Sequence, residues 1–379
     1  MYPYLIVFFL TAILALASFS NKSKPKSFFF FYVVAIGVFV GLSDMLGGYD
    51  RYIYAEVFTS NAEGIVDGDS EVYEKFFSKE PLYGLINTLI GFLTPNRYVF
   101  ILLYTLIVYI VYAVCFYKYT EYPFFALLVF LGLMFFFTFT YLRQVLAAGI
   151  VWLSLPYYRD RKKWKYMGMI LLAAMTHNSA AIMALLYFIP LKKRSFNAIM
   201  PVMLGLFVLG LIGVGQAFTI FGGLIGSDNI SSHANEAEYG FRYEYVVESI
   251  LFLIILYNNY NTVANDEETL SYLNLYLMFC GILLLFCKSS DGGRIAWYGI
   301  MGIIIMLTRF CKSGRGVPLR YGLVLMFFAL FMRILLLWGM GKILYPYKTF
   351  LTDGVRDGDT TWEQYEYDHE YDKDKLYNL

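Results

Sequence analysis

An arginine at the junction of two apolar runs is the first residue of this sequence that could take part in chemistry. The stretch Tyr141-Leu142-Arg143-Gln144 lies at a tight connection between apolar segments. The planar guanidinium of Arg143 suits a phosphate or a carboxylate, because it can donate two parallel hydrogen bonds. Gln144 follows it as a second candidate binding residue. The alternative is a structural arginine that reaches the polar headgroups from a helix end.

A second polar group, Thr176-His177-Asn178-Ser179, interrupts a long apolar run. His177 could accept a proton as a general base, or it could donate a hydrogen bond to a phosphate. Asn178 and Ser179 fit ligand binding and helix capping equally well. The alternative is a buried histidine that caps a break between two half-helices.

Carboxylates beside aromatic residues form the third group, between residues 44 and 81. Aromatic rings and carboxylates together are what a sugar-binding surface offers, since rings stack on apolar sugar faces and carboxylates accept hydroxyl protons. Most acids of this segment fit an ordinary solvated loop. Asp50 and Glu80 lie close to the ends of apolar spans, so either could take a proton from an acceptor hydroxyl.

Three further charged residues lie in or beside apolar runs. Arg294 ends the stretch Asp291-Gly292-Gly293-Arg294, and we expect it to face the same side as Arg143 and share an anionic ligand. Arg333 lies in the last apolar run and Glu248 in a short one. Ionisable residues at membrane depth are usually functional, although these two could also pair with neighbours.

The composition excludes several functional classes. Of the 379 residues, 59% are hydrophobic and only 16% are charged, against about 45–50% and about 25% in soluble domains. The sequence is therefore predicted to be a polytopic membrane protein, and not a soluble, disordered or nucleic-acid-binding chain. It has no P-loop, G-x-S-x-G, H-E-x-x-H or C-x-x-C motif, so we expect neither a metal nor a cofactor.

The spacing of apolar residues predicts an all-α helical bundle with about 10–12 transmembrane or half-membrane helices. We assign residues 1–342 to one membrane domain, which includes a long external loop at 44–96, and residues 343–379 to an acidic, Tyr-rich tail. The expected spans cover residues 2–20, 28–43, 98–117, 123–140, 142–158, 166–190, 198–221, 246–257, 270–287, 295–308 and 321–341.

Lysine and arginine cluster in a few connections, which predicts that those connections are cytoplasmic. The acidic connections around 44–80 and 222–245 are predicted to be external. The run 166–190 is long enough to cross once, yet basic clusters flank both of its ends. We therefore predict a broken hairpin with both ends in the cytoplasm and His177 at its apex.

The order of these features resembles that of the EpsG family of bacterial exopolysaccharide proteins, which is related to Wzy-type O-antigen polymerases. The resemblance rests on features that run in family order across residues 1–190: Asp50-x-x-x-Tyr54-x-x-x-Phe58, Glu80-Pro81, Arg143-Gln144-x-x-Ala147, Lys162-Lys163 and Ala174-x-x-His177-x-Ser179.

The resemblance implies a metal-independent membrane glycosyltransferase in the bacterial cytoplasmic membrane. Such an enzyme joins polyprenyl-diphosphate-linked oligosaccharide repeat units at the outer face, in exopolysaccharide, capsule or O-antigen biosynthesis. Its further partners would be the lipid bilayer and the chain-length regulator and flippase of the same pathway. The candidate catalytic residues are then Asp50, Glu80 and His177, and the candidate substrate-binding residues are Arg143, Gln144, Arg294, Arg333, Tyr54, Asn178 and Ser179.

Two other classes stay open at this point. A lipid-linked glycan flippase would line a path through the bilayer with cations, instead of gathering them on the outer side. A membrane acyltransferase that modifies polysaccharide would need its histidine within reach of a cytosolic acyl donor.

Overall fold

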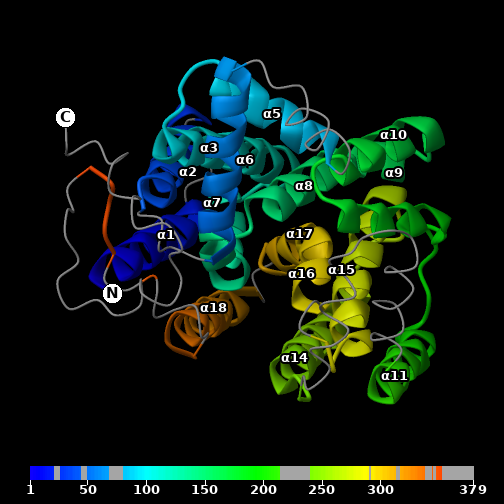
Figure 1. The fold of residues 1–379 in the computed structure, drawn as a ribbon. Helices are drawn as coiled ribbons and strands as arrows, with labels where there is room; N and C mark the ends of the chain where they lie inside the picture. Colours follow the sequence, from blue (N-terminus) through cyan, green and yellow to red (C-terminus); the bar gives the residue numbers. More distant parts are fainter. Residues whose placement is uncertain are drawn as a thin grey trace. The chain divides into compact units, whose positions relative to one another are not determined.

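The protein is helical throughout the part of the chain that the structure describes. The computed structural model describes residues 1–20, 26–43, 49–67, 80–213, 240–289, 292–312, 316–337, 344 and 347–351. These residues form no strand, and one isolated bridge joins Ser43 to Thr349. The elements, drawn in Figure 1, are α1 (Tyr2–Ser20), α2 (Lys26–Gly41), α3 (Tyr49–Asp67), α5 (Pro81–Gly91), α6 (Arg97–Tyr119), α7 (Pro123–Leu133), η2 (Phe135–Phe139), α8 (Leu142–Leu153), α9 (Leu155–Arg159), α10 (Lys163–Ala174), η3 (Asn178–Phe188), α11 (Phe196–Ile212), α14 (Tyr243–Asn259), η4 (Tyr260–Thr262), α15 (Glu267–Leu285), α16 (Gly292–Ala296), η5 (Trp297–Gly299), α17 (Ile300–Phe310) and α18 (Val317–Leu337).

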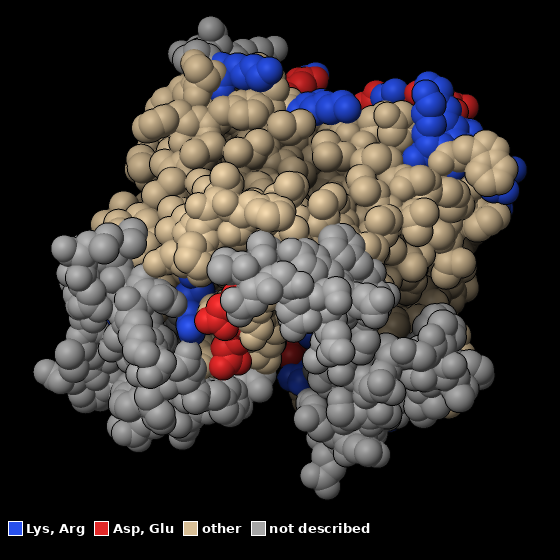
Figure 2. Space-filling view, turned by 45° about the horizontal axis from the view of Figure 1, so that its top comes forward, with Lys and Arg blue, Asp and Glu red and all other residues tan. Residues whose placement is uncertain are grey.

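Length and hydropathy confirm the predicted all-α polytopic membrane fold. Among the described residues, five helical segments are long and apolar enough to cross a bilayer: Tyr2–Ser20, Arg97–Tyr119, Glu267–Leu285, Gly292–Phe310 and Val317–Leu337. Large apolar side chains on them face outward, with Ile6 64% and Leu325 69% exposed. Figure 2 shows a face of the molecule on which wide areas of the described surface carry no charged residue. Such a surface is stable in lipid and not in water.

The chain divides into two compact units, and each has its own packed helices. Unit 1 comprises residues 1–153, 168–181 and 311–379, and unit 2 comprises residues 154–167 and 182–310. In unit 1, α6 packs against α2, α3, α5 and α8, while α7 packs against α1 and α18. A Cβ at Gly132 of α7 would stand 2.7 Å from the Phe327 ring of α18. Small residues of this kind let membrane helices approach closely.

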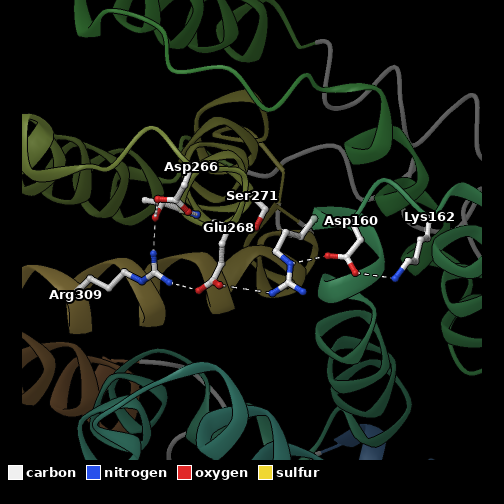
Figure 3. A network of polar contacts seen from close by, with 8 residues as sticks. Asp160, Lys162, Asp266, Glu268, Ser271 and Arg309 are labelled. Atoms are coloured by element: carbon white, nitrogen blue, oxygen red, sulfur yellow. Dashed lines mark hydrogen bonds and ion pairs between the residues drawn. The ribbon is translucent and has the colours of Figure 1, made fainter.

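In unit 2, α15 lies at the centre and packs against α11, α14, α16 and α17. Figure 3 shows a polar network that joins α15 to the ends of α9 and α17. Arg309 donates to Glu268 and to Thr269, and Glu268 also pairs with Arg159 at 3.6 Å. Asp160 pairs with Lys162 at 2.9 Å. Several of the basic residues used to predict a cytoplasmic loop are therefore neutralised by acids of the same unit.

The connection predicted as a long external loop, residues 44–96, contains two packed helices. Helix α3 packs against α5 and α6 and buries Tyr52, Ala55 and Phe58. These residues recur at helical spacing, while acids such as Glu63 lie on the exposed side. A narrow apolar stripe of this kind does not stand out in average hydropathy, although it is enough to dock a helix.

The predicted broken hairpin is confirmed. Helix α10 ends at Ala174, and the chain reverses into η3. In unit 2 the Tyr166 hydroxyl donates to the Met183 carbonyl at 2.6 Å, and the Tyr187 hydroxyl donates to the Arg161 carbonyl at 2.7 Å. The two ends therefore lie together, while the apex residues belong to unit 1. The side of the membrane that the ends face stays a prediction.

Arg51, which lies within the predicted external loop at residues 44–96, is fully buried in unit 1. Its guanidinium donates to the carbonyls of Val40, Gly41 and Ser43, at and just after the end of α2, at 2.7–3.2 Å. It also donates to the Phe139 carbonyl, at the end of η2, at 3.3 Å. Carbonyls at a helix C-terminus lack intrahelical partners and favour a cation, so Arg51 ties α3 to two helix ends.

We expect Arg51→Met to lower the free energy of unfolding by about 3 kcal/mol, because each buried carbonyl left without its donor costs about 1–3 kcal/mol. Thermal unfolding of the detergent-purified protein measures the change. The control is Arg159→Met, whose ion pairs are solvent-exposed and are worth about 1 kcal/mol or less. Equal melting temperatures for the two variants would contradict this role for Arg51.

Candidate functional site

A carboxylate and a guanidinium far apart in the sequence form an ion pair in unit 1. Arg143 Nη1 donates to Glu80 Oε2 at 2.6 Å, and the side chains are 34% and 10% exposed. Glu80 directly precedes Pro81, the first residue of α5, and Arg143 lies in the first turn of α8. Proline is favoured at the first position of a helix because its missing N–H would have no partner there. It therefore fixes the helix start that carries Glu80.

Three tyrosines surround this pair. The guanidinium carbon of Arg143 lies 4.9 Å from the centre of the Tyr54 ring and 5.5 Å from that of Tyr83. The Tyr83 ring in turn packs edge-on against the Tyr104 ring, with the two ring centres 5.8 Å apart. Aromatic faces attract a partly desolvated cation by about 0.5–2 kcal/mol. Ring contacts from α3 and α5, together with the charge of Glu80, thus hold the Arg143 side chain, and Tyr104 of α6 packs behind Tyr83.

The apex of the hairpin closes the other side of Glu80. The backbone N–H of Asn178 donates to Glu80 Oε1 at 3.3 Å. The N–H of Leu82 donates to the Met175 carbonyl at 2.9 Å, which fixes the start of α5 to the end of α10. Glu80 therefore joins α8 to the hairpin apex through its two carboxylate oxygens.

The polar residues of the apex are linked to α8. Gln144 Nε2 donates to Ser179 Oγ at 3.4 Å, and Ser179 Oγ lies 2.8 Å from His177 Nδ1. The backbone N–H of Ser179 donates to the same ring nitrogen at 3.4 Å. The consecutive residues Arg143 and Gln144 thus contact Glu80 and the apex, respectively.

Three buried polar atoms of this region find no hydrogen-bond partner among the described residues: the Tyr104 hydroxyl, Arg143 Nε and Asn87 Oδ1. A buried polar atom without a partner costs about 1–3 kcal/mol, and native proteins rarely leave several close together. Two of these atoms, the hydroxyl and Nε, can donate. The cluster can therefore hydrogen-bond an oxygen-rich, anionic ligand.

Burial in this cluster raises the pKa of the Glu80 carboxyl above its ordinary value of 4.5, while Arg143 and the Asn178 N–H oppose the rise. Desolvation disfavours a charged carboxylate, and an adjacent cation favours it. A carboxylate with a raised pKa accepts a proton more readily than an ordinary glutamate, which suits it to general-base chemistry.

Seven of the residues predicted from the sequence meet in this cluster: Tyr54, Glu80, Arg143, Gln144, His177, Asn178 and Ser179. Asp50 lies in the first turn of α3, one turn before Tyr54. Arg333 lies on α18, which packs against α1 and α7, and Arg294 lies on α16 of unit 2.

Sequence reasoning missed Tyr83, Tyr104 and Asn87. Tyr83 follows Glu80 by three residues, so helical spacing alone could have placed it beside that carboxylate. Tyr104 lies in an apolar, tyrosine-rich span, where nothing in its neighbours distinguishes it from an ordinary packing residue. Asn87 lies one turn after Tyr83 and is fully buried.

Comparison with known proteins identifies the family. A sequence model of the EpsG family matches residues 26–349, which is most of the chain and includes every residue of the Glu80–Arg143 cluster. No curated protein and no solved structure gave a significant match. With its apolar helices, this multi-pass membrane chain therefore belongs to the EpsG family, a Wzy-like polymerase family.

Proposed function

We propose that the protein is a membrane glycosyltransferase that polymerises polysaccharide from polyprenyl-diphosphate-linked oligosaccharide repeat units. Membership of a Wzy-like polymerase family supports the reaction class. The observation that carries the proposal further is the Glu80–Arg143 pair, since it supplies a proton acceptor and a permanent cation side by side. This transfer needs both groups, one for the attacking hydroxyl and one for the diphosphate that leaves.

The bond changes follow from these two groups. The acceptor hydroxyl oxygen attacks the anomeric carbon of the donor sugar, and the bond between that carbon and the phosphate oxygen breaks. The hydroxyl proton moves to the Glu80 carboxylate. The polyprenyl diphosphate departs with the bonding electrons, and the Arg143 guanidinium stabilises the charge that develops on it.

The ion pair couples the two halves of this step. A protonated Glu80 no longer neutralises Arg143, so the guanidinium is released from its carboxylate as the leaving group gains charge. Arg143 Nε, a buried donor without a partner among the described residues, provides a further hydrogen bond for a phosphate oxygen. Tyr54 and Tyr83 hold the guanidinium in place by their ring faces.

Glu80 is the better candidate for the base than Asp50. It touches Arg143 and the hairpin apex directly, and its pKa is raised by burial. Asp50 lies in the first turn of α3, where a carboxylate also stabilises the positive end of the helix dipole. We therefore assign proton transfer to Glu80. We assign helix stability and acceptor binding to Asp50.

Reconstitution tests the proposed function. The purified protein in liposomes receives a synthetic polyprenyl-diphosphate-linked repeat unit, and the products are separated by length. We expect a ladder of two, three and more joined units and release of one polyprenyl diphosphate for each bond formed. If the labelled substrate only crosses the bilayer and no bond forms, the protein is a carrier and the proposal is wrong.

The membrane orientation is part of the proposal, because repeat units are joined on the outer face. We expect single cysteines at exposed positions within 60–70, such as Glu63, and at 228–236 to react with an impermeant thiol reagent in intact cells, and those at 160–165 and 309–320 not to react. The physical reason is the retention of Lys- and Arg-rich connections in the cytoplasm. The background lacks the four native cysteines. Labelling of cysteines at 160–165 in intact cells would show that the orientation is opposite to the one proposed.

A further inference from the structure

We propose that His177 serves as a hydrogen-bond donor through Nε2, toward a phosphate oxygen of the lipid-linked substrate, and not as the base of the transfer. This inference deepens the proposed function and rests on it for the identity of the ligand. The hydrogen bonds that fix the imidazole stand on their own, and they come from two elements of unit 1, the hairpin apex and α8.

The Nδ1 nitrogen of the His177 ring accepts hydrogen bonds. The backbone N–H of Ser179 donates to His177 Nδ1 at 3.4 Å. A backbone N–H can only donate, so Nδ1 must present a lone pair. Ser179 Oγ lies 2.8 Å from the same nitrogen, and its hydroxyl can therefore only donate to it.

A side chain of α8, Gln144, orients the Ser179 hydroxyl. Gln144 Nε2 donates to Ser179 Oγ at 3.4 Å, so the oxygen accepts from α8 and directs its own proton to the imidazole. The chain of donors runs from Gln144 through Ser179 to His177. Gln144 and Ser179 are thus positioning residues for the ring, and neither has to touch the substrate.

The consequence follows from the two tautomers of neutral imidazole. When Nδ1 accepts, the ring proton resides on Nε2, which then acts as a donor. A ring in this state has no lone pair on Nε2 with which to take a proton from an acceptor hydroxyl. The base must therefore be another group, and Glu80 is adjacent to the same apex through the Asn178 N–H.

The ligand class follows from the neighbours of His177. The residue next to it contacts Glu80 Oε1, and Glu80 Oε2 contacts Arg143 at 2.6 Å. A phosphate oxygen that takes the place of Glu80 beside Arg143 therefore comes close to the apex. A neutral N–H donor adds a directional hydrogen bond to that oxygen, and loss of one such donor typically costs 10²–10³ in rate.

Replacing His177 with glutamine or with asparagine distinguishes a hydrogen-bond donor from a base. The amide nitrogen of glutamine can occupy the position of Nε2, whereas that of asparagine reaches only as far as Nδ1. We expect His177→Gln to lower the polymerisation rate by less than about 10-fold and His177→Asn to lower it by about 10²-fold. Both variants must reach the membrane at normal abundance. Equal inactivity of the two at normal abundance would overturn the donor role.

The pH dependence gives a second readout. If Glu80 is the base, His177→Gln should keep the acidic limb of the rate profile seen in the native protein, because no imidazole contributes to that limb. A shift of the limb in His177→Gln would assign it to His177 and overturn the proposal. A variant that merely perturbed the fold would lower the rate at every pH without a shift.

The tautomer itself is measurable without any substrate. The sequence has three histidines, at positions 177, 233 and 369. A His233→Gln/His369→Gln variant, labelled with ¹⁵N-histidine and reconstituted in lipid at pH 8, gives the signal of one imidazole. At this pH, above the ordinary imidazole pKa of about 6.5, the ring is neutral. We expect an unprotonated Nδ1 and a protonated Nε2, and a protonated Nδ1 would overturn the inference.

The two experiments distinguish the failure of this inference from that of the proposed function. If the native protein joins no repeat units while the spectrum shows a protonated Nε2, the donor assignment stands and the glycosyltransferase proposal fails. If polymer forms normally and Nδ1 carries the proton, the reaction stands and the assignment of His177 fails.

Discussion

Replacement of Arg143 with alanine is expected to lower the polymerisation rate by about 10²–10³-fold, or roughly 3–4 kcal/mol in transition-state stabilisation. The variant loses the permanent cation that we place beside the leaving diphosphate. It also loses the contacts with Glu80 and Tyr54. Arg143→Lys should recover little activity, because an ammonium cannot grip two oxygens in one plane. Polymer length and amount in the reconstituted assay measure both effects.

Arg309→Ala is a matched control for this variant. Arg309 is 36% exposed, pairs with Glu268 and lies 5.0 Å from the centre of the Tyr272 ring, so its surroundings resemble those of Arg143. It belongs to the polar network of unit 2 and not to the Glu80 cluster. A loss of activity in Arg143→Ala alone, at equal abundance, supports a chemical role. Normal polymer from a well-expressed Arg143→Ala variant would make this arginine structural.

A double variant distinguishes the loss of the Arg143 cation from the effect of leaving the buried Glu80 carboxylate without an ion-pair partner. Arg143→Ala leaves the Glu80 carboxylate buried without its cation, which is costly by itself. Adding Glu80→Gln removes that unpaired charge. If Arg143→Ala acted only by leaving the Glu80 carboxylate unpaired, the double variant would regain both stability and activity. We expect it to regain stability alone.

The sequence predicts that Arg294 binds the same anionic ligand as Arg143. If the two arginines bind one anion, the effects of Arg143→Ala and Arg294→Ala on the rate should be non-additive. Additive effects would assign Arg294 to a separate role in unit 2.

Replacement of Glu80 with glutamine is expected to lower the rate by about 10²–10⁴-fold, the contribution typical of a general base. Glutamine keeps an oxygen for the Asn178 N–H but cannot take up a proton. Glu80→Asp keeps the carboxylate on a shorter stem, so it should retain part of the activity. The assay is the reconstituted reaction, under substrate saturation.

The pH profile of the native protein should carry the signature of this carboxylate. Glu80 must be unprotonated to act, and burial raises its pKa. The rate should therefore fall on acidification at a pH above the ordinary glutamate value of 4.5. Glu268→Gln, which alters the analogous carboxylate of the Arg309 pair, is the control and should leave the profile in place. A profile unchanged in a still-active Glu80→Gln variant would exclude Glu80 as the base.

The sequence by itself determined the membrane class, the regions of the apolar helices and the hairpin. A high apolar fraction cannot be accommodated in water, so composition alone excluded a soluble fold. Basic clusters on both sides of residues 166–190 required a reversal, and the contacts of Tyr166 and Tyr187 with the opposite arm show that reversal. Arg143, Glu80 and His177 could also be selected from the sequence, because polar residues beside apolar runs are costly and hence few.

Only the tertiary structure decided which of these residues act together. Glu80 meets Arg143 across 63 residues and Asn178 across 98, and no local pattern encodes such pairs. The same holds for Arg51. It lies in a predicted loop by sequence, whereas in the structure its buried guanidinium donates hydrogen bonds to carbonyls at two helix ends. In a bilayer nearly every helix face is apolar, so hydrophobic periodicity does not say which faces touch. Close packing and buried hydrogen bonds decide the neighbours, and these exist only once the helices have met.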